Sequence, residues 1–155
     1  MLQNPKFWLA MLAGVIALGY LALKVLATTA KKPERAENPG ALEPCPDSPN
    51  CVCSEDARES HTIDPLSYEG DDAAAWSKLQ SVLKNLGGKE VRAGDEYLWF
   101  EFRTKLVGFV DDVECRLNPD KKQIEIRSAS RVGYSDLGAN RKRVNAIRKA
   151  FQSRS

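Results

Sequence analysis

The segment EYLWFEFRTKLVGFVDDVECRLNPDKKQIEIRSAS, residues 96–130, decides the fold. It contains three strand-like stretches, at residues 96–103, 109–117 and 123–127. In the first stretch, polar or aromatic side chains alternate with an apolar face that consists of Leu98, Phe100 and Phe102. Turn-forming residues 118–121 connect the last two stretches. Consecutive strands with short connections predict an antiparallel meander.

Two amphipathic helices are predicted by the helical spacing of apolar side chains on either side of this segment. The first covers residues 71–88, with acids at its start and glycines at its end. The second covers about residues 137–152, and its apolar stripe consists of Leu137, Val144, Ile147 and Phe151. Residues 89–93 add a short strand. These elements predict an α+β fold, an antiparallel meander with both helices on one face, as a single domain over residues 45–155.

The N-terminus carries an uncharged apolar run, FWLAMLAGVIALGYLAL, that begins at Phe7. As a helix this run would be about 25 Å long at about 1.5 Å per residue. If Lys24 snorkels outward, the span approaches the hydrocarbon thickness of about 30 Å. We expect residues 1–27 to be a single-pass anchor that contacts the membrane through residues 7–27. The alternative is a cleaved signal peptide, whose apolar region is usually shorter.

Charge is distributed unevenly along the chain. The whole chain has 23 basic and 21 acidic residues and a formal net charge of +2. Residues 45–72, however, carry a net charge of −7, and residues 127–155 carry +7. Residues 28–44 are rich in proline and predict an extended linker. Because few aromatic residues accompany the C-terminal basic ones, no nucleic-acid partner is expected.

Two rules place the domain on different sides of the membrane. Lys24, Lys31, Lys32 and Arg35 follow the apolar run, so the positive-inside rule would leave the domain in the cytoplasm. A disulfide instead requires an oxidising compartment. Since long domains translocate with limited regard to charge, we favour a single-pass membrane protein whose domain is extracytoplasmic, in the periplasm or a lumen.

The chain has four cysteines, Cys45, Cys51, Cys53 and Cys115. The first three could form a Cys3His zinc set with His61, but they lack the C-x2-C spacing typical of zinc sites, so no metal is predicted. An even count after an export-like N-terminus favours disulfides. Cys45 and Cys51 can close a small loop. Strand parity points Cys115 toward the core, either as a free thiol or as the partner of Cys53, and the pairing stays open.

Residues 127–143, RSASRVGYSDLGANRKR, gather hydroxyl, amide and guanidinium groups at a strand end, a loop and a helix start. The candidate binding residues here are Arg127, Ser130, Arg131, Ser135, Asp136, Asn140 and Arg141. Such groups can bind a small anionic ligand, such as phosphate or a carboxylate. The alternative is structural, with Ser135 or Asp136 capping the helix and the arginines paired or solvated. Structural use is favoured, because the Asp136 carboxylate would compete with an anion for the same N–H groups.

Asp111 interrupts the apolar face of its strand, whereas Asp112 faces the other way. Either a bulge redirects the strand, or the Asp111 carboxylate is buried and paired. The available cations are Arg103, Arg127 and Arg131. A buried network of carboxylates and arginines is usually structural, although it can also mark a site.

Motifs of common enzyme classes are absent from the chain: it has no GxSxG, HExxH, Walker or dinucleotide-binding pattern. His61, the one histidine, lies in the acidic segment. There we expect a surface side chain rather than a general base. No cofactor is predicted.

Three segments resemble one protein family: CPDSPNCV at residues 45–52, GFVDDVE at 108–114 and IRSASRVGYSDLGANRKRV at 126–144. Over about residues 42–153 the chain is similar to domain of unknown function 1499, a family of mainly bacterial and plastid proteins that often have a hydrophobic N-terminus. The resemblance implies no general activity. In the family pattern a serine commonly occupies the position of Cys53 and an apolar residue that of Cys115. The joint departure suits a Cys53–Cys115 bridge beside a family-like Cys45–Cys51 pair.

Three hypotheses for function are consistent with these features. We favour a membrane-tethered, non-catalytic module that binds a protein partner or an anionic group through its basic C-terminal face. The second is a hydrolase-like enzyme with a cleft formed by Asp111, Asp112, Arg127, Arg131, Ser135 and Asp136. The third is an accessory subunit of a larger membrane complex.

Overall fold

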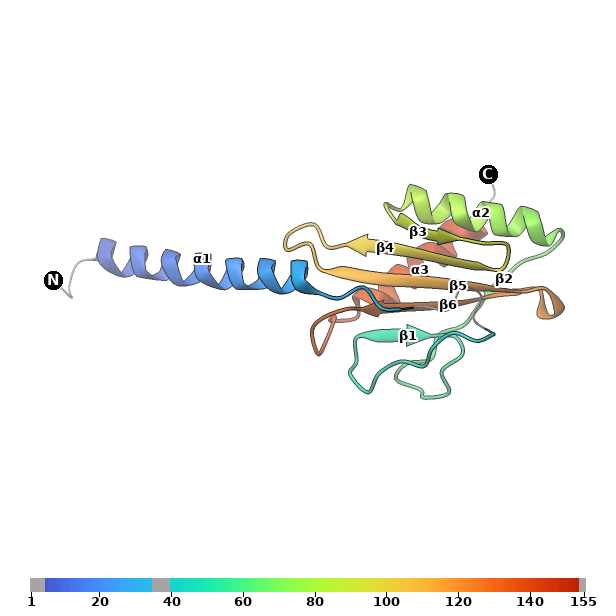
Figure 1. The fold of residues 1–155 in the computed structure, drawn as a ribbon, viewed down its shortest axis with the longest axis horizontal. Coiled ribbons are helices and arrows are strands. Elements are labelled where there is room, and N and C mark those ends of the chain that lie inside the picture. Colours follow the sequence, from blue (N-terminus) through green and yellow to red (C-terminus); the bar gives the residue numbers. More distant parts are fainter. Residues whose placement is uncertain (1–4, 35–39, 154–155) are drawn as a thin grey trace.

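The computed structural model describes residues 5–34 and 40–153. A long N-terminal helix precedes an α+β domain in which two helices pack on one face of a six-stranded antiparallel sheet (Figure 1). The helices are α1 (Pro5–Thr29), α2 (Asp72–Asn85) and α3 (Ala139–Gln152), with a short 3-10 helix, η1 (Pro119–Lys121). The strands are β1 (Cys51–Cys53), β2 (Leu66–Ser67), β3 (Lys89–Ala93), β4 (Tyr97–Arg103), β5 (Val110–Asn118) and β6 (Gln123–Ser130). The predicted fold class is therefore confirmed.

The strands β3 to β6 form the predicted meander, since each pairs with the next in antiparallel register. The order across the sheet is β1-β6-β5-β4-β3, and β2 also pairs with β6. The sequence did not predict β1 and β2 as strands. They are three and two residues long, too short to show an alternating pattern.

The two domain helices match the predicted positions with one correction. The side chain of Asp71 accepts a hydrogen bond from Ala74 N at 2.8 Å and caps α2. The start of α3 is Ala139, later than predicted. Leu137 precedes this helix with a φ of 53° and is 88% exposed, so its predicted place on the apolar stripe is wrong. The rest of that stripe is buried, at Val144, Ile147 and Phe151.

The main core lies between the two helices and the sheet. The apolar face of β4 belongs to it, as alternation predicted. Side chains with no exposed surface include Leu79, Leu83, Phe100, Val113, Ile124, Ile126, Val144 and Ile147. Each such side chain contributes about 1.5–3 kcal/mol relative to an exposed one. This core accounts for the position of both helices on one face.

The opposite face of the sheet is buried as well. Tyr97 and Trp99, which alternate with the core residues of β4, are 0% and 3% exposed. They form a second apolar cluster with Leu42, Cys45, Cys51, Cys53 and Ala129. Most of these partners come from β1 and the chain around it, residues 40–61, which we term the cover segment. Along β1, β4, β5 and β6 the sheet is thus a buried middle layer rather than a layer with one wet face, whereas the edge strand β3 is largely exposed.

An ion pair and a disulfide close the cover segment. Asp56 accepts hydrogen bonds from the backbone N–H groups of Cys45 and Arg58, both at 3.0 Å. The Arg58 guanidinium lies 2.6 Å from the same carboxylate, and this hydrogen bond holds the pKa of Asp56 well below its ordinary value. Cys45 and Cys51 are joined by a disulfide, with their Cα atoms 5.6 Å apart. The predicted Cys45–Cys51 loop is confirmed.

The predicted Cys53–Cys115 bridge is wrong, because both residues are free buried thiols. Cys53 pairs in register with Arg127, and Cys115 pairs with Ile126. Since successive residues of a strand point to opposite faces, the two sulfurs lie on opposite sides of the sheet. Burial raises the pKa of Cys53 to about 11 and also raises that of Cys115.

His61 is buried rather than on the surface, as the sequence had suggested. Only 4% of it is exposed, and its Nδ1 lies 3.1 Å from the carbonyl oxygen of Cys51. The cover segment folds back on itself here, because Cys53 N donates to His61 O at 2.9 Å. The disulfide occupies two sulfurs of the zinc set considered above, and the described residues contain no group of three or more metal-ligating side chains.

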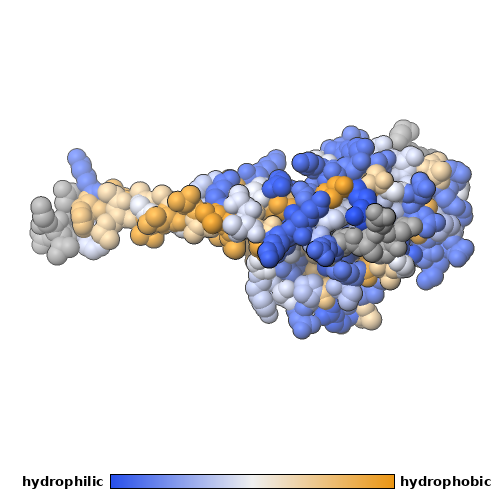
Figure 2. Space-filling model, in the orientation of Figure 1, coloured by the Kyte–Doolittle hydropathy of each residue, from blue (hydrophilic) through white to orange (hydrophobic). Residues whose placement is uncertain are grey.

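The helix α1 is long and apolar enough to cross a membrane, judged by length and composition. Its most apolar window has a mean hydropathy of 2.2, and none of that window is buried. Figure 2 shows it as an apolar stalk beside a domain whose visible face is largely hydrophilic. An apolar helix that its own domain leaves uncovered calls for another apolar environment.

A count of thiols distinguishes one disulfide from two. Full-length, unreduced chain unfolded in guanidinium is expected to react with a thiol reagent at two sulfurs, those of Cys53 and Cys115. Before unfolding, both should react slowly at pH 8, because they are buried and protonated. If no thiol reacts after unfolding, a second disulfide must be present. If four thiols react, no disulfide forms.

Candidate functional site

The residues predicted as a site do not converge on one cleft. The cover side of the sheet holds Asp112, Arg127 and Arg131, the helix side holds Asp111, Ser130 and Asn140, and the loop before α3 holds Ser135 and Asp136. Arg141 lies on α3, and Arg103 lies at the end of β4. The structure therefore divides the predicted site into separate groups.

Asp112 is the centre of the cover-side group and is 2% exposed. Its carboxylate accepts two hydrogen bonds from Arg131, from Nε at 2.8 Å and from Nη2 at 2.7 Å. Trp99 Nε1 also donates to it at 2.7 Å. Glu101 lies opposite Asp112 in the register, and Arg131 Nη2 reaches it at 2.7 Å. One guanidinium thus neutralises two adjacent acids, and its hydrogen bonds to Asp112 raise the pKa of Arg131.

A second buried ion pair lies on the same face. Arg127 Nη1 lies 2.8 Å from Glu114 Oε2, and Tyr97 OH donates to Glu114 Oε1 at 2.7 Å. Arg127 and Glu114 are 5% and 1% exposed. Both pairs are therefore out of contact with bulk water, where each charge depends on its partner.

Asp111 is buried and paired, which was one of the two alternatives left open by the sequence. It is 2% exposed, and Arg143 Nη2 lies 2.5 Å from its Oδ2. The register of β4 and β5 runs without a shift from Val110, so the other alternative, a bulge, does not occur within this strand. The partner of Asp111 is none of the three arginines that were considered from the sequence, because it comes from α3. The Arg143 guanidinium also lies over the ring of Phe102, 5.3 Å from its centroid.

Asn140 joins α3, β6 and the cover segment, and it has no exposed surface. Its Nδ2 donates to Asn50 O at 2.8 Å and to Ser130 Oγ at 3.0 Å. Its Oδ1 accepts from Ser128 Oγ and Arg143 Nη1, both at 2.6 Å. All four hydrogen bonds that the amide can make are formed, so this side chain is a structural junction.

The loop before α3 uses its own backbone donors. Asp136 accepts from Gly138 N at 2.9 Å and from Asn140 N at 2.7 Å. Ser135 Oγ accepts from Leu137 N at 3.3 Å. The N–H groups that an anion would need are thus occupied by side chains.

The structure describes residues 127–153 of the basic C-terminal segment. Each arginine in this range has a partner elsewhere in the domain. Arg127, Arg131 and Arg143 pair with carboxylates. Arg141 donates to the carbonyl oxygens of Thr62 and Ser60, and Arg148 donates to that of Asp64. Arg103, by contrast, is a strand-end side chain that is 58% exposed and 3.4 Å from Glu101. The buried charges hold the domain together and offer no open face to a substrate.

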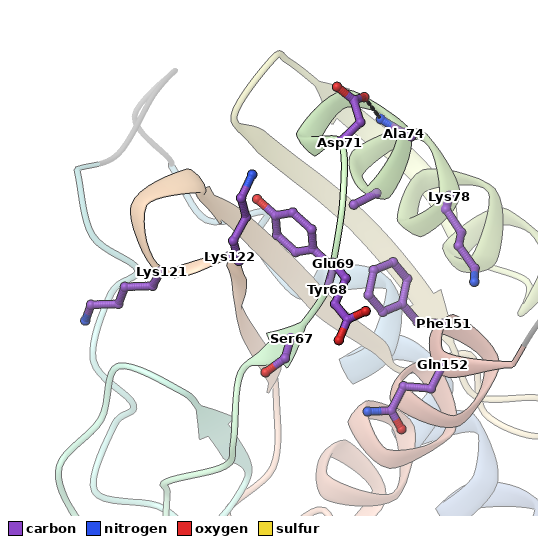
Figure 3. A pocket seen from close by; sticks show the side chains of 11 residues that line it. Ser67, Tyr68, Glu69, Asp71, Ala74, Lys78, Lys121, Lys122, Phe151 and Gln152 are labelled. Carbon is purple, nitrogen blue, oxygen red and sulfur yellow. Dashed lines mark hydrogen bonds between the residues drawn. The ribbon is translucent and has the colours of Figure 1, made fainter.

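An open pocket of about 780 Å³ is drawn in Figure 3. The elements around it meet at the end of the sheet far from α1 (Figure 1). The chain after β2, the turn at η1, and the facing helices α2 and α3 form its walls. The rings of Tyr68 and Phe151 lie in it, and Glu69 and Lys78 project beside them (Figure 3). Lys78 Nζ lies 5.6 Å from the centroid of the Phe151 ring. Lys121 points away from the other labelled side chains (Figure 3).

One wall of this pocket is a hydrogen-bonded group. Tyr68 OH donates to Asp72 Oδ1 at 2.7 Å, and Lys122 Nζ lies 2.7 Å from the same oxygen. Burial, together with Asp72, raises the pKa of Tyr68 to about 12. Lys122 in turn lowers the pKa of Asp72. At neutral pH Tyr68 therefore remains a neutral hydroxyl and Asp72 a carboxylate.

None of the polar side chains of this pocket was among the site residues predicted from the sequence. Phe151 was expected in the apolar stripe of the last helix, and Tyr68 lies in a short segment without a periodic pattern. Their proximity depends on how the chain after β2 lies against α3, which no local spacing shows. Glu101, Glu114 and Arg143 were missed for a different reason. Alternation placed the two acids opposite the core, but it did not show that the cover segment buries that face.

A family model described as "Protein of unknown function (DUF1499)" matches residues 41–151. The match spans the cover segment, the sheet and nearly all of both domain helices, and it leaves out α1. Comparisons with curated proteins and with solved structures give no match.

Removing the Arg131 guanidinium leaves the carboxylates of Asp112 and Glu101 buried without their shared cation. We expect Arg131→Ala to lower the free energy of unfolding by about 3–5 kcal/mol. The measurement is denaturant unfolding of the detergent-solubilised full chain, followed by tryptophan fluorescence. Arg103→Ala is the matched control, because it removes a mostly exposed partner of Glu101 and should cost less than about 1 kcal/mol. Equal losses from the two variants would contradict this account of the cluster.

Proposed function

This chain belongs to the DUF1499 family, whose description names no activity, and from its geometry we propose that it is a membrane-tethered, non-catalytic module that binds a segment of a partner protein. The observation that carries the proposal is the open pocket between β2, α2 and α3. Its volume, about 780 Å³, is in the usual range for binding pockets.

The pocket has the features of a peptide-binding groove. Two aromatic rings, Tyr68 and Phe151, supply apolar contact area, and Glu69 and Lys78 supply charges of opposite sign. The backbone of β2 forms one wall of the pocket. Among the described strands β2 pairs with β6 alone, so its other edge has no strand partner. An unpaired strand edge beside side-chain pockets is a recurring way to bind an extended peptide.

The basic C-terminal face is a weaker location for the same function. Its described arginines already pair with carboxylates or carbonyl oxygens. Lys142 and Lys149 remain exposed on α3, and they lie outside the pocket. We therefore place the protein partner in the pocket rather than on the arginines. A small anionic ligand has less support, because the loop N–H groups already donate to the side chains of Ser135 and Asp136.

A hydrolase-like mechanism has less support as well. The predicted catalytic carboxylates, Asp111 and Asp112, are each 2% exposed and ion-paired. Substrate would have to separate these pairs before it reached either carboxylate. The accessory-subunit alternative also requires a protein partner. A stoichiometric complex would favour an accessory subunit over a transient binding module.

We also propose that α1 is an uncleaved anchor and that the domain lies on the extracytoplasmic side. The length and hydropathy of α1 support the anchor. The Cys45–Cys51 disulfide supports an oxidising compartment. The lysines that follow the apolar run favour the opposite orientation, which makes topology worth a direct test.

Site-specific photo-crosslinking tests the pocket. A photoreactive amino acid placed at Glu69 or at Gln152, in membranes of the native source, is expected to capture the same protein from both positions. The matched control position is Asn145, which is exposed on α3 outside the pocket. Capture from Asn145 but from neither pocket position would contradict the proposal.

Charge reversal locates the binding surface independently. We expect Lys78→Glu to reduce the crosslink yield by about tenfold, since loss of a charged contact and gain of a like charge together cost over 1 kcal/mol. Lys149→Glu introduces the same charge on α3 away from the pocket and should leave the yield unchanged. If Lys149→Glu abolishes capture and Lys78→Glu does not, the partner binds the basic C-terminal face instead.

Protease protection tests the topology. In intact spheroplasts that express the full chain, external protease should cleave the linker after α1 and release the domain. Cleavage only after lysis would place the domain in the cytoplasm. Release of the domain into the soluble fraction without protease would show that α1 is a cleaved signal peptide.

A further inference from the structure

The exposed apolar side chains of the domain gather at one end. Four large hydrophobic side chains of the described residues beyond α1 are exposed. Leu86 is 42% exposed, whereas the other three are far more so: Leu106 at 81%, Tyr134 at 77% and Leu137 at 88%. A single exposed leucine is ordinary. Three in two neighbouring loops suggest a surface that something covers.

The two loops lie at the same end of the sheet. Residues 104–109 connect β4 to β5, and residues 131–138 connect β6 to α3. Arg103 pairs with Val110 across the first loop. The second loop begins beside it, because Arg131 N donates to Val110 O at 3.1 Å. Figure 1 shows both loops near the C-terminal end of α1.

A direct contact fixes the position of the first loop along α1. Tyr20 OH donates to Leu106 O at 3.0 Å. The apolar run of α1 ends at Leu23, so Tyr20 lies about 5 Å inside that end, at about 1.5 Å per residue. Segments that lie in a membrane interface typically insert about 5–10 Å. The exposed loops are thus at the level of the lipid headgroups if α1 spans the bilayer.

Leu137 is held in an unusual conformation. Its φ of 53° lies in the left-handed region, which a leucine seldom adopts because its Cβ crowds the backbone. Hydrogen bonds to Ser135 and Asp136 fix the backbone around it. Packing within the domain does not account for this geometry, since the side chain is exposed. Strain of this kind commonly occurs at functional sites.

We infer that residues 104–109 and 131–138 form a membrane-docking edge, in which Leu106, Tyr134 and Leu137 insert into the headgroup region of the bilayer that α1 spans. The inference rests on the proposed anchorage of α1. Leucine and tyrosine side chains are suited to this depth, where an apolar body and a polar tip are both solvated. Lys105, beside Leu106, and Lys24 of α1 are cations that favour anionic lipid. The domain is then attached to the membrane at two points, and its pocket faces away.

The occupant of this edge is a lipid surface rather than a protein. The apolar side chains are on loop tips, and they line neither the open pocket nor the two smaller cavities, of about 290 and 160 Å³. They also adjoin a helix that has the length and composition of a membrane span. Insertion of separate side chains into lipid requires no complementary shape, whereas a protein interface does.

Depth-dependent fluorescence quenching tests this inference on the full chain. Single cysteines are introduced as Leu106→Cys, Tyr134→Cys and Leu137→Cys, labelled with an environment-sensitive dye, and reconstituted in vesicles of phosphatidylcholine and phosphatidylglycerol. Unmodified chain is the labelling blank, since Cys53 and Cys115 are buried. The matched control is Gln152→Cys, at the exposed far end of the domain. The Leu106 site lies beside α1, since the carbonyl oxygen of Leu106 accepts a hydrogen bond from Tyr20 OH.

We expect lipids with a quencher near the headgroup to quench the three edge probes at least about threefold more strongly than the control probe, as interfacial insertion requires. Iodide in the aqueous phase should show the reverse order. Equal quenching of edge and control probes would overturn the inference. Quenching of the Leu106 probe alone would also overturn it, because that result would reflect the contact with α1 rather than with lipid.

A double variant provides a second measurement. Leu106→Asp with Leu137→Asp puts two charges on the edge and, because both side chains are exposed, should leave the fold intact. The Tyr134→Cys probe in this background is expected to become as accessible to iodide as the control. Retained protection in the double variant would overturn the inference.

Flotation of the unmodified chain with vesicles separates failure of the anchor from failure of docking. If the chain does not float with vesicles at all, the proposed anchor itself fails. If it floats while the edge probes stay aqueous, the anchor stands and only docking fails.

Discussion

The buried ion pairs on the cover side of the sheet are the constraint on which the rest of the domain depends. Charged residues alternate with core residues along β4, β5 and β6, so one face of the sheet carries Glu101, Asp112, Glu114 and Arg127. A face of this kind could have been left in water. Here the cover segment closes over it, and every charge that it buries requires a partner. The disulfide and the Asp56–Arg58 pair keep that cover in place.

This constraint explains the use of the basic C-terminal segment. Its net charge of +7 suggests a surface for anions, yet the structure uses Arg127, Arg131 and Arg143 to neutralise acids from β4 and β5. The acidic segment, with its −7, meets the same basic segment mainly through backbone carbonyl oxygens, at Ser60, Thr62 and Asp64. A near-neutral domain can therefore have strongly charged ends without presenting either as a binding surface.

The domain has two unlike ends as a result. At one end the strand connections next to α1 carry exposed leucine and tyrosine side chains. At the other, β2, α2 and α3 leave a pocket whose walls contain aromatic rings and satisfied polar groups. The main core and the cover-side ion pairs lie between them and keep the two ends in a fixed relation. Under the proposed anchorage through α1, the pocket faces the aqueous phase.

The sequence by itself determined the elements whose signal is local. The alternation in residues 96–130 predicted the meander, and the helical spacing in residues 71–88 and about 137–152 predicted the two helices, because periods of 2 and 3.6 are properties of a single segment. The Cys45–Cys51 loop was likewise within local reach. The tertiary structure alone decided what lies opposite the core. Asp111 pairs with Arg143, 32 positions away, and the sulfurs of Cys53 and Cys115 lie on opposite sides of the sheet, because such contacts depend on how the cover segment and α3 pack, which no spacing within one segment contains.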